Sequence, residues 1–355
     1  MRALMDQQTN TTYPVAIKKL SGSRIEIKTS VGADEFDATQ SEAIRRIGAD
    51  VELPGFRKGH VPEKVLITKI GEAALLEEMA EISISRAYPT IVVAEKIDVL
   101  GRPEIHISKI ARGNPLEFTI TTAVFPEYEL PDYKKIAAKA GKTKAEVTVN
   151  EEDMTKTLEQ IRRMRAQSIA ESEGKEFDES APLPELDDAY VATLGEFKNL
   201  EELRAKLQEN MLTEKSREVK DKKRIAIMEA IVADTKIELP EIIIDQELLR
   251  MEDEFSADVA RMGLDIEGYL KKVEKTKEDM RKDWRPDAIK RAIIQILVGK
   301  IADAEKIEPD QTLIERDVKA LQARYPEAEK DRIHSYVHML LTNEKVFEFL
   351  ESQIS

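Results

Sequence analysis

Apolar residues that recur every three or four positions dominate the second half of the chain. After Leu239-Pro240 the spacing is carried by Ile244, Leu248, Met251, Phe255, Val259 and Met262. This spacing places the side chains on one face of an α-helix. Nearly every segment from residue 183 onward has the same pattern, and Pro240, Pro309 and Pro326 separate one helix from the next. We therefore expect this half to be a set of amphipathic helices.

The charge density limits how far such helices can be buried. Charged residues make up 35% of the 355 positions, apolar residues 41% and aromatic residues 5%. The length suits two or three domains, and helices this polar cannot be covered on all sides. Apolar faces are then available to pack together or to meet a partner, and an aromatic-lined pocket for a small molecule is not expected.

The first part of the chain has a different pattern. Alternating apolar residues predict two strands between 15 and 31, a helix covers 34–49, and a Pro- and Gly-rich loop follows. Helices at 63–70 and 72–94 and strands at 104–110 and 116–125 complete this part. The predicted fold class is α+β, with a small N-terminal α+β domain followed by a mostly helical domain.

The domain boundaries follow from these patterns. Residues 1–14 are expected to form a disordered leader, residues 15–133 the α+β domain and residues 183–355 the helical domain. Residues 134–182 are interpreted as a linker with one helix at 151–167. The linker begins with five lysines and no acid among them, and residues 168–188 carry eight acids and only Lys175.

Several classes of chemistry have no support in the sequence. The net charge of −14 excludes binding of DNA by bulk electrostatics, and the absence of cysteine excludes disulfides and thiolate metal sites. Neither a Walker A loop nor a GxGxxG loop is present. His334 and His338 have a spacing that can hold zinc, but Ser335 stands where a metalloprotease has Glu, so surface or packing roles are preferred. We predict no cofactor, no metal and no catalytic residue.

Membrane segments and targeting signals are also not expected. The N-terminus has no apolar core, and no apolar run approaches the roughly 20 residues of a membrane span. The chain is expected to act in the cytoplasm.

The loop between the two Pro residues is the strongest candidate site. Pro54 and Pro62 enclose Gly55, Phe56, Arg57, Lys58, Gly59 and His60. The glycines allow sharp turns that expose the aromatic and the two cations between them. Six basic and three acidic residues lie between 45 and 70, so the region is locally positive in an acidic chain. Such a tip suits RNA phosphate or an acidic protein patch. The alternative is an ordinary turn whose Phe56 folds back onto the core.

At this loop the sequence resembles the trigger factor family of bacterial chaperones. The family's signature Gly-Phe-Arg-x-Gly-x-x-Pro is matched by Gly55, Phe56, Arg57, Gly59 and Pro62. The resemblance resumes at Leu183-Pro184-Glu185-Leu186, at Leu239-Pro240 with Ile243, Ile244 and Asp245, and from Arg285-Pro286 to Ile307. It covers most of residues 15–350.

The resemblance implies that the helical domain is elongated and has arms. It also implies an ATP-independent chaperone that docks at the ribosomal tunnel exit. Residues 55–60 would contact a tunnel-exit protein and local rRNA, and the helical domain would hold nascent and unfolded chains. Met251, Phe255 and Met262 are the candidate client-contacting residues, because flexible thioethers and aromatics suit variable apolar partners. The resemblance leaves open a homodimer when the protein is free.

One departure from the family concerns catalysis. Members usually carry an FKBP-like prolyl isomerase domain, which needs about 100 residues. Here the helix at 151–167 leads almost directly into Leu183-Pro184, and Phe177 is the one aromatic between Lys134 and Ala189. We therefore expect that domain to be missing. The alternatives to a holding chaperone are a prolyl isomerase and an acidic helical adaptor without chaperone activity.

Overall fold

The computed structural model describes residues 13–52, 54, 56, 61–142, 148–172, 174, 183–195 and 197–354. The first elements are β1 (Val15–Leu20), β2 (Arg24–Val31), α1 (Ala33–Asp37), α2 (Gln40–Asp50), α3 (Glu63–Ile70), α4 (Glu72–Ala94), β3 (Val99–Lys109) and β4 (Leu116–Val124). The later elements are α5 (Tyr133–Ala140), α6 (Glu151–Ser172), α7 (Asp188–Ala192), α8 (Leu200–Asp234), α9 (Glu241–Arg261), α10 (Ile266–Lys272), α11 (Lys277–Glu305), α12 (Gln311–Arg324) and α13 (Lys330–Ser352). The predicted α+β class, with a helical second part, is confirmed.

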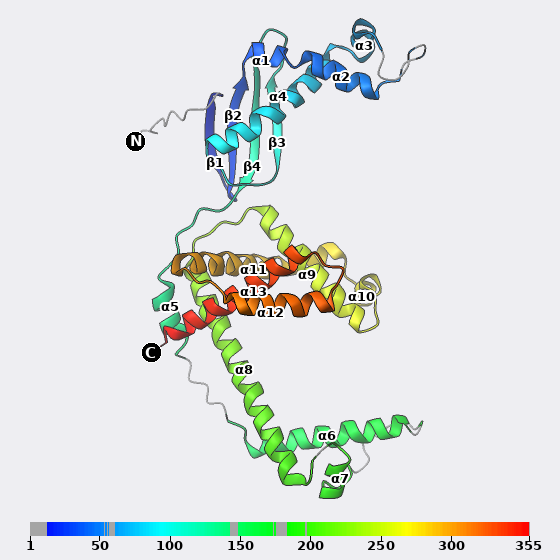
Figure 1. Ribbon diagram of the computed structural model, residues 1–355, viewed down its shortest axis with the longest axis vertical. Helices are drawn as coiled ribbons and strands as arrows, with labels where there is room; N and C mark the ends of the chain where they lie inside the picture. The colour runs from blue at the N-terminus through cyan, green and yellow to red at the C-terminus, as the bar shows by residue number, and fades with distance from the viewer. Residues whose placement is uncertain are drawn as a thin grey trace. The chain divides into compact units, whose positions relative to one another are not determined.

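The four strands form one antiparallel sheet in the order β1-β2-β4-β3, and α4 lies across one of its faces (Figure 1). In β2, Ile25, Ile27 and Val31 alternate with more exposed residues and point to the helix side. Ile27 pairs with Ile120 of β4, and both are fully buried. The strand period thus places the main core of this part between the sheet and α4.

The predicted helix at 34–49 is two helices in the structure, α1 and α2. The break falls at Thr39, whose buried hydroxyl donates a hydrogen bond to the Phe36 carbonyl at 2.7 Å. Such a local side-chain bond competes with the helical ladder, which accounts for the interruption. By contrast, α3 and α4 have the predicted bounds, and the predicted strand at 104–110 begins earlier, at Val99.

The lysine-rich segment interpreted as a solvated linker contains a helix, which corrects that interpretation for residues 133–140. The side chain of Asp132 caps α5 by accepting from the backbone N–H of Lys135 at 3.2 Å. Ala137 is fully buried, and α5 contacts α8 and α13. Tyr133 donates a hydrogen bond to Glu305 at 2.5 Å, and partial burial together with this bond raises the pKa of Tyr133 to about 12. The lysines are solvated while the other face of the helix is packed.

The contacts divide the chain into two units, with the residues of α11 shared between them. One unit holds Met1–Glu129 and Lys236–Ile296, and the other holds Leu130–Thr235 and Leu297–Ser355. The predicted boundaries at 133 and 183 stay predictions. Most of the predicted leader, residues 1–12, lies outside the described residues, whereas Tyr13 is buried and its hydroxyl donates to Glu35 at 2.7 Å.

Helix boundaries in the second half follow capping side chains. Asn199 accepts from the N–H of Glu202 at 2.9 Å and caps the start of α8. Helix α11 begins at Lys277, well before Pro286. The hydroxyl of Thr276 accepts from the N–H of Asp279 at 3.1 Å, and the Asp279 carboxylate accepts from the N–H of Thr276 at the same distance. This reciprocal capping starts the helix early, and Pro286 lies inside it.

Candidate docking groove and client-binding surfaces

The candidate loop lies between α2 and α3. Helix α2 ends at Asp50, and Pro62 is the N-cap of α3, close to the predicted opening position. Of the predicted docking residues, Phe56 is described by the structure. Gly55, Arg57, Lys58, Gly59 and His60 lie outside the described residues.

Phe56 does not fold back into the core. Its exposed fraction is 41%, and it is not among the residues of the core between the sheet and α4. With Pro54 it lines a shallow groove of about 550 Å³ against one side of α3, which contributes Lys64, Val65, Thr68 and Lys69. We call this surface the loop groove. Val65 is 39% exposed, so an aromatic and an aliphatic side chain are both open to solvent there.

Helix α3 is amphipathic in a way that fixes the loop groove. Leu66 is almost fully buried and approaches Gly48 of α2, while Ile67 and Ile70 pack against the core. The opposite face therefore directs Lys64 and Lys69 outward. Within the described residues, neither lysine forms an ion pair. An apolar floor flanked by two such cations fits an anionic or phosphate-bearing partner that also has an apolar contact.

The sequence search did not identify the α3 side of the groove. Lys64, Val65 and Lys69 lie on a regular helix with no unusual composition. The helical period does place positions 64, 65, 68 and 69 on one face, opposite the apolar positions 66, 67 and 70. This polar face could have been found from the sequence by its period. Only the packing of α3 shows that it is the opposite face that is buried.

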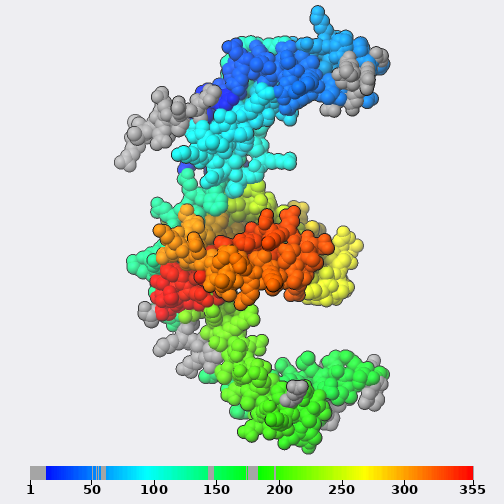
Figure 2. Space-filling model, viewed as in Figure 1, coloured from blue at the N-terminus to red at the C-terminus, as the bar shows by residue number. Residues whose placement is uncertain are grey.

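A second apolar surface lies on the hairpin of α12 and α13. Ile333 and Val337 of α13 are buried against Ile314 and Val318 of α12. Tyr336, Met339 and Leu340 face away from that contact, with exposed fractions of 52%, 47% and 52%. In Figure 2 the two helices, orange to red, lie on the visible face of the molecule. Three large apolar side chains at positions i, i+3 and i+4 of one helix form a stripe that suits an unfolded partner.

The three predicted client-contacting residues have different environments. Met262 is 73% exposed just after α9. Phe255 is half-buried, with ring centroids 5.1 Å from Tyr269 and 5.2 Å from Trp284 in edge-to-face geometry. Met251 packs against the cluster formed by Ile244, Leu248 and Ala288. Of the three, Met262 is thus exposed, whereas Met251 and Phe255 are half-buried.

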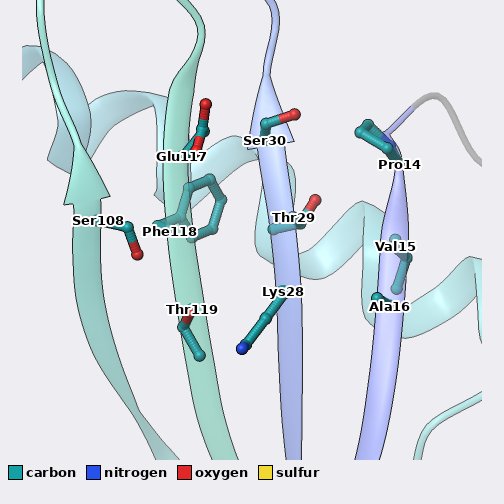
Figure 3. A pocket seen from close by; sticks show the side chains of 10 residues that line it. All are labelled: Pro14, Val15, Ala16, Lys28, Thr29, Ser30, Ser108, Glu117, Phe118 and Thr119. Carbon is teal, nitrogen blue, oxygen red and sulfur yellow. The ribbon is translucent and has the colours of Figure 1, made fainter.

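A further hollow of about 430 Å³ lies over the strands (Figure 3). Lys28 and Glu117 are its charged side chains, whereas Phe118 and Thr29 are buried.

His334 and His338 lie exposed on α13, and the structure places the Thr342 hydroxyl 3.5 Å from Nδ1 of His338. No group of three metal-ligating side chains occurs among the described residues. In the part of the chain that the structure describes, no helix is long and apolar enough to span a membrane.

Comparison with known families decides the relationship of this chain to other proteins. A family model described as bacterial trigger factor protein matches residues 14–161, and a model of the trigger factor C-terminus matches residues 199–351. The chain belongs to the trigger factor family. Trigger factor of Alkaliphilus metalliredigens is 25% identical over 90% of this chain and 92% of its own length. Trigger factor of Streptococcus mutans is 26% identical over 85% of this chain and 90% of its own length.

Solved structures show the same fold. A chain from a study of promiscuous substrate recognition in the folding and assembly activities of the trigger factor chaperone superimposes with a TM-score of 0.55. The alignment covers 96% of this chain and all of the other, at 17% identity. The likeness supports the predicted architecture of an α+β part followed by helical arms.

The FKBP-like domain of the family is absent from this trigger factor, as predicted. The two matched segments leave residues 162–198 between them, far fewer than the roughly 100 residues of a compact domain. The alignment with the Alkaliphilus metalliredigens protein extends over 399 positions, more than the 355 residues of this chain. The relative therefore has residues for which this chain has no counterpart.

Proposed function

We propose that this trigger factor is a ribosome-associated, ATP-independent chaperone that docks through residues 55–60 and the loop groove. The observation that carries the proposal is the exposed Phe56 beside Lys64 and Lys69 on a rigid helix face. Arg57 and Lys58 add two cations to the same loop. Together they match a partner that combines an apolar contact with rRNA phosphates or acidic protein side chains. We propose the cytoplasm as the location of the protein, because ribosomes with nascent chains are found there.

The test of docking is co-sedimentation with purified ribosomes. Replacing Phe56, Arg57 and Lys58 together with Ala is expected to abolish association, because each charge-assisted contact contributes roughly 1.5–3 kcal/mol. Suppression of aggregation of an unfolded client should be unchanged, since the helical surfaces are untouched. Ribosome association that survives the triple change would refute the docking site.

We further propose that clients bind the exposed apolar residues of the helical part. The stripe of Tyr336, Met339 and Leu340 supports this, as does the exposure of Met262. Met251 and Phe255 remain proposed contacts, although both also pack within the protein. The paired change Met339→Glu and Leu340→Glu should weaken aggregation suppression without loss of ribosome binding. His334→Glu adds charge at an exposed position on the other side of the same helix and is the control.

The absence of the FKBP-like domain leads us to propose that the protein has no prolyl isomerase activity. A protease-coupled assay with a prolyl tetrapeptide should show no acceleration over the uncatalysed rate. Turnover that an FKBP-type inhibitor blocks would overturn this part of the proposal.

Self-association of the free protein is a separate proposal, which the exposed apolar stripe of α13 supports. Sedimentation velocity measures it.

A further inference from the structure

The edge of the sheet opposite β1 borders a cleft that the proposed ribosome and client contacts do not use. Strand β3 forms this edge and pairs with β4 on its inner side. Helix α4 lies across one face of the sheet (Figure 1). The cleft between them has a volume of about 440 Å³. Its lining comes from Glu77, Glu81, Ile84, Ser85 and Tyr88 of α4 and from Pro103, Ile105 and Ile107 of β3.

The lining is apolar inside and acidic at the rim. Ile105 is 45% exposed, and Ile107 is partly buried against the core. Glu77 and Glu81 lie one helical turn apart on α4, both exposed, and neither forms an ion pair with a described residue. An apolar side chain can therefore enter the cleft while a cation beside it meets two carboxylates.

The backbone of β3 is suited to pair with another strand. Every second residue of an edge strand directs its N–H and C=O away from its neighbour. The ladder with β4 shifts register between Leu100 and Glu104 and again between Ile107 and Lys109. Such irregularities interrupt pairing, so the regular stretch Glu104–Ile107 is where an added strand would fit. Side chains of that strand would alternate toward and away from the cleft.

One buried polar atom also points to an incomplete site. The hydroxyl of Tyr88, at the cleft, is buried and has no hydrogen-bond partner among the described residues. Buried polar groups are paired in the great majority of cases. A backbone carbonyl entering the cleft would supply an acceptor for this hydroxyl.

We infer that the cleft between α4 and β3 binds an extended, cationic peptide segment that adds to Glu104–Ile107 as a fifth strand. Its apolar side chain contacts Ile105 and Ile107, and an adjacent Lys or Arg meets Glu77 and Glu81. Main-chain hydrogen bonds supply affinity without sequence specificity, and the cleft selects apolar–basic alternation. The inference rests on the proposed client-binding function, because the segment is taken to be part of an unfolded client.

The first test uses a fluorescein-labelled eight-residue peptide in which Ile alternates with Lys, followed by fluorescence anisotropy. Ile105→Asp should raise its Kd at least tenfold. Ile17→Asp is the matched control, because Ile17 has an exposed fraction of 44% and lies on the opposite edge strand, β1. This control should change Kd less than twofold, and circular dichroism checks that both variants fold. Equal binding by the wild type and Ile105→Asp overturns the inference.

The second test separates strand addition and charge selection from nonspecific attraction to an acidic protein. A peptide with the same side chains but alternate backbone amides N-methylated should bind at least tenfold more weakly, since it cannot form the ladder. The paired change Glu77→Lys and Glu81→Lys should weaken the Ile–Lys peptide tenfold and strengthen an Ile–Glu peptide. Equal binding of the methylated peptide, or no change of charge preference, contradicts the inference.

Aggregation suppression distinguishes the failure of this inference from failure of the proposed function. If the wild type does not suppress aggregation of an unfolded client, the proposed function fails, and this inference fails with it. If suppression is intact but the peptide binds Ile105→Asp as it binds the wild type, the strand-addition site alone is refuted.

Discussion

The orientation of α3, and with it the loop groove, depends on a single residue between α3 and α4. Gly71 ends α3 and is also the N-cap of α4, with φ of 87° and ψ of 156°. Residues other than glycine rarely adopt this conformation. The direction of the chain between α3 and α4 therefore depends on the absence of a side chain at this position.

Gly71→Ala is expected to lower the free energy of unfolding by roughly 1–3 kcal/mol, because the backbone conformation is strained for Ala. Urea unfolding followed by circular dichroism measures the change. Gly32→Ala is the matched control: Gly32 caps α1 with φ of −59°, and no atom lies near its added Cβ. That variant should stay within about 0.5 kcal/mol of the wild type. Equal losses at the two positions would contradict the argument.

At the scale of elements, α8 and α13 are joined by an arginine with two carboxylate partners. Arg224 donates to both oxygens of Glu344 at 2.8 and 2.6 Å and to Glu351 at 2.8 Å. The Arg224 side chain is only 13% exposed, and its guanidinium lies 5.1 Å from the ring centroid of Phe347. Glu351 is 18% exposed and Glu344 47%, so the pair with Glu351 is screened less than a surface pair.

Arg224→Ala should lower the free energy of unfolding by roughly 2 kcal/mol, between the values for exposed and buried pairs. Lys222→Ala is the control on the same helix, since Lys222 pairs with Glu218 across an exposed surface. Its expected loss is below about 0.5 kcal/mol. Thermal or urea unfolding of the two variants measures both losses of unfolding free energy. Similar losses would contradict the argument that the partly buried Arg224 contacts stabilise the protein more than an exposed pair does.

The same contact predicts a dependence on pH. Hydrogen bonds from Arg224 hold the pKa of Glu344 below its ordinary value of 4.5. A carboxyl group whose pKa is lower in the folded state stabilises that state above pH 4.5, and this contribution is lost as the pH falls through the folded value. The difference in unfolding free energy between wild type and Arg224→Ala should therefore shrink below pH 4.5. Urea unfolding at pH 7, 5, 4 and 3 tests this, and a constant difference would contradict it.

At the scale of the whole molecule, the loop proposed for docking is basic, whereas the chain as a whole has a net charge of −14. Ribosome association should therefore be local and sensitive to salt, because it depends on a few cations meeting phosphate or carboxylate groups. The rest of the acidic surface would be repelled by rRNA. This arrangement favours one orientation of the protein on the ribosome.

The paired change Lys64→Glu and Lys69→Glu should reduce co-sedimentation with ribosomes at least tenfold and flatten its salt dependence. Lys271→Glu with Lys272→Glu changes the net charge equally, on exposed positions of α10, and should have little effect. Co-sedimentation across a range of salt concentrations measures both. Equal effects of the two pairs would show that net charge, rather than the loop groove, governs binding.

Periodicity and the positions of proline and glycine were enough to predict most elements of the N-terminal part. These signals are local, and the bounds of α3 and α4 followed from them. The family motif was also a local signal, in the order of Gly55, Phe56, Arg57, Gly59 and Pro62. What the sequence determined by itself was therefore the class of fold, the family and the loop.

Tertiary structure decided which faces are covered, because burial depends on contacts between segments far apart in the chain. The lysine-rich segment at 133–140 is a helix since α8 and α13 cover one side of it. Phe255 is half-buried by Tyr269 and Trp284, whereas Tyr336, Met339 and Leu340 have no such cover. The cleft beside β3 likewise exists only because α4 leaves the edge of the sheet open. A local pattern specifies an apolar face, and only packing determines whether the protein or a partner buries it.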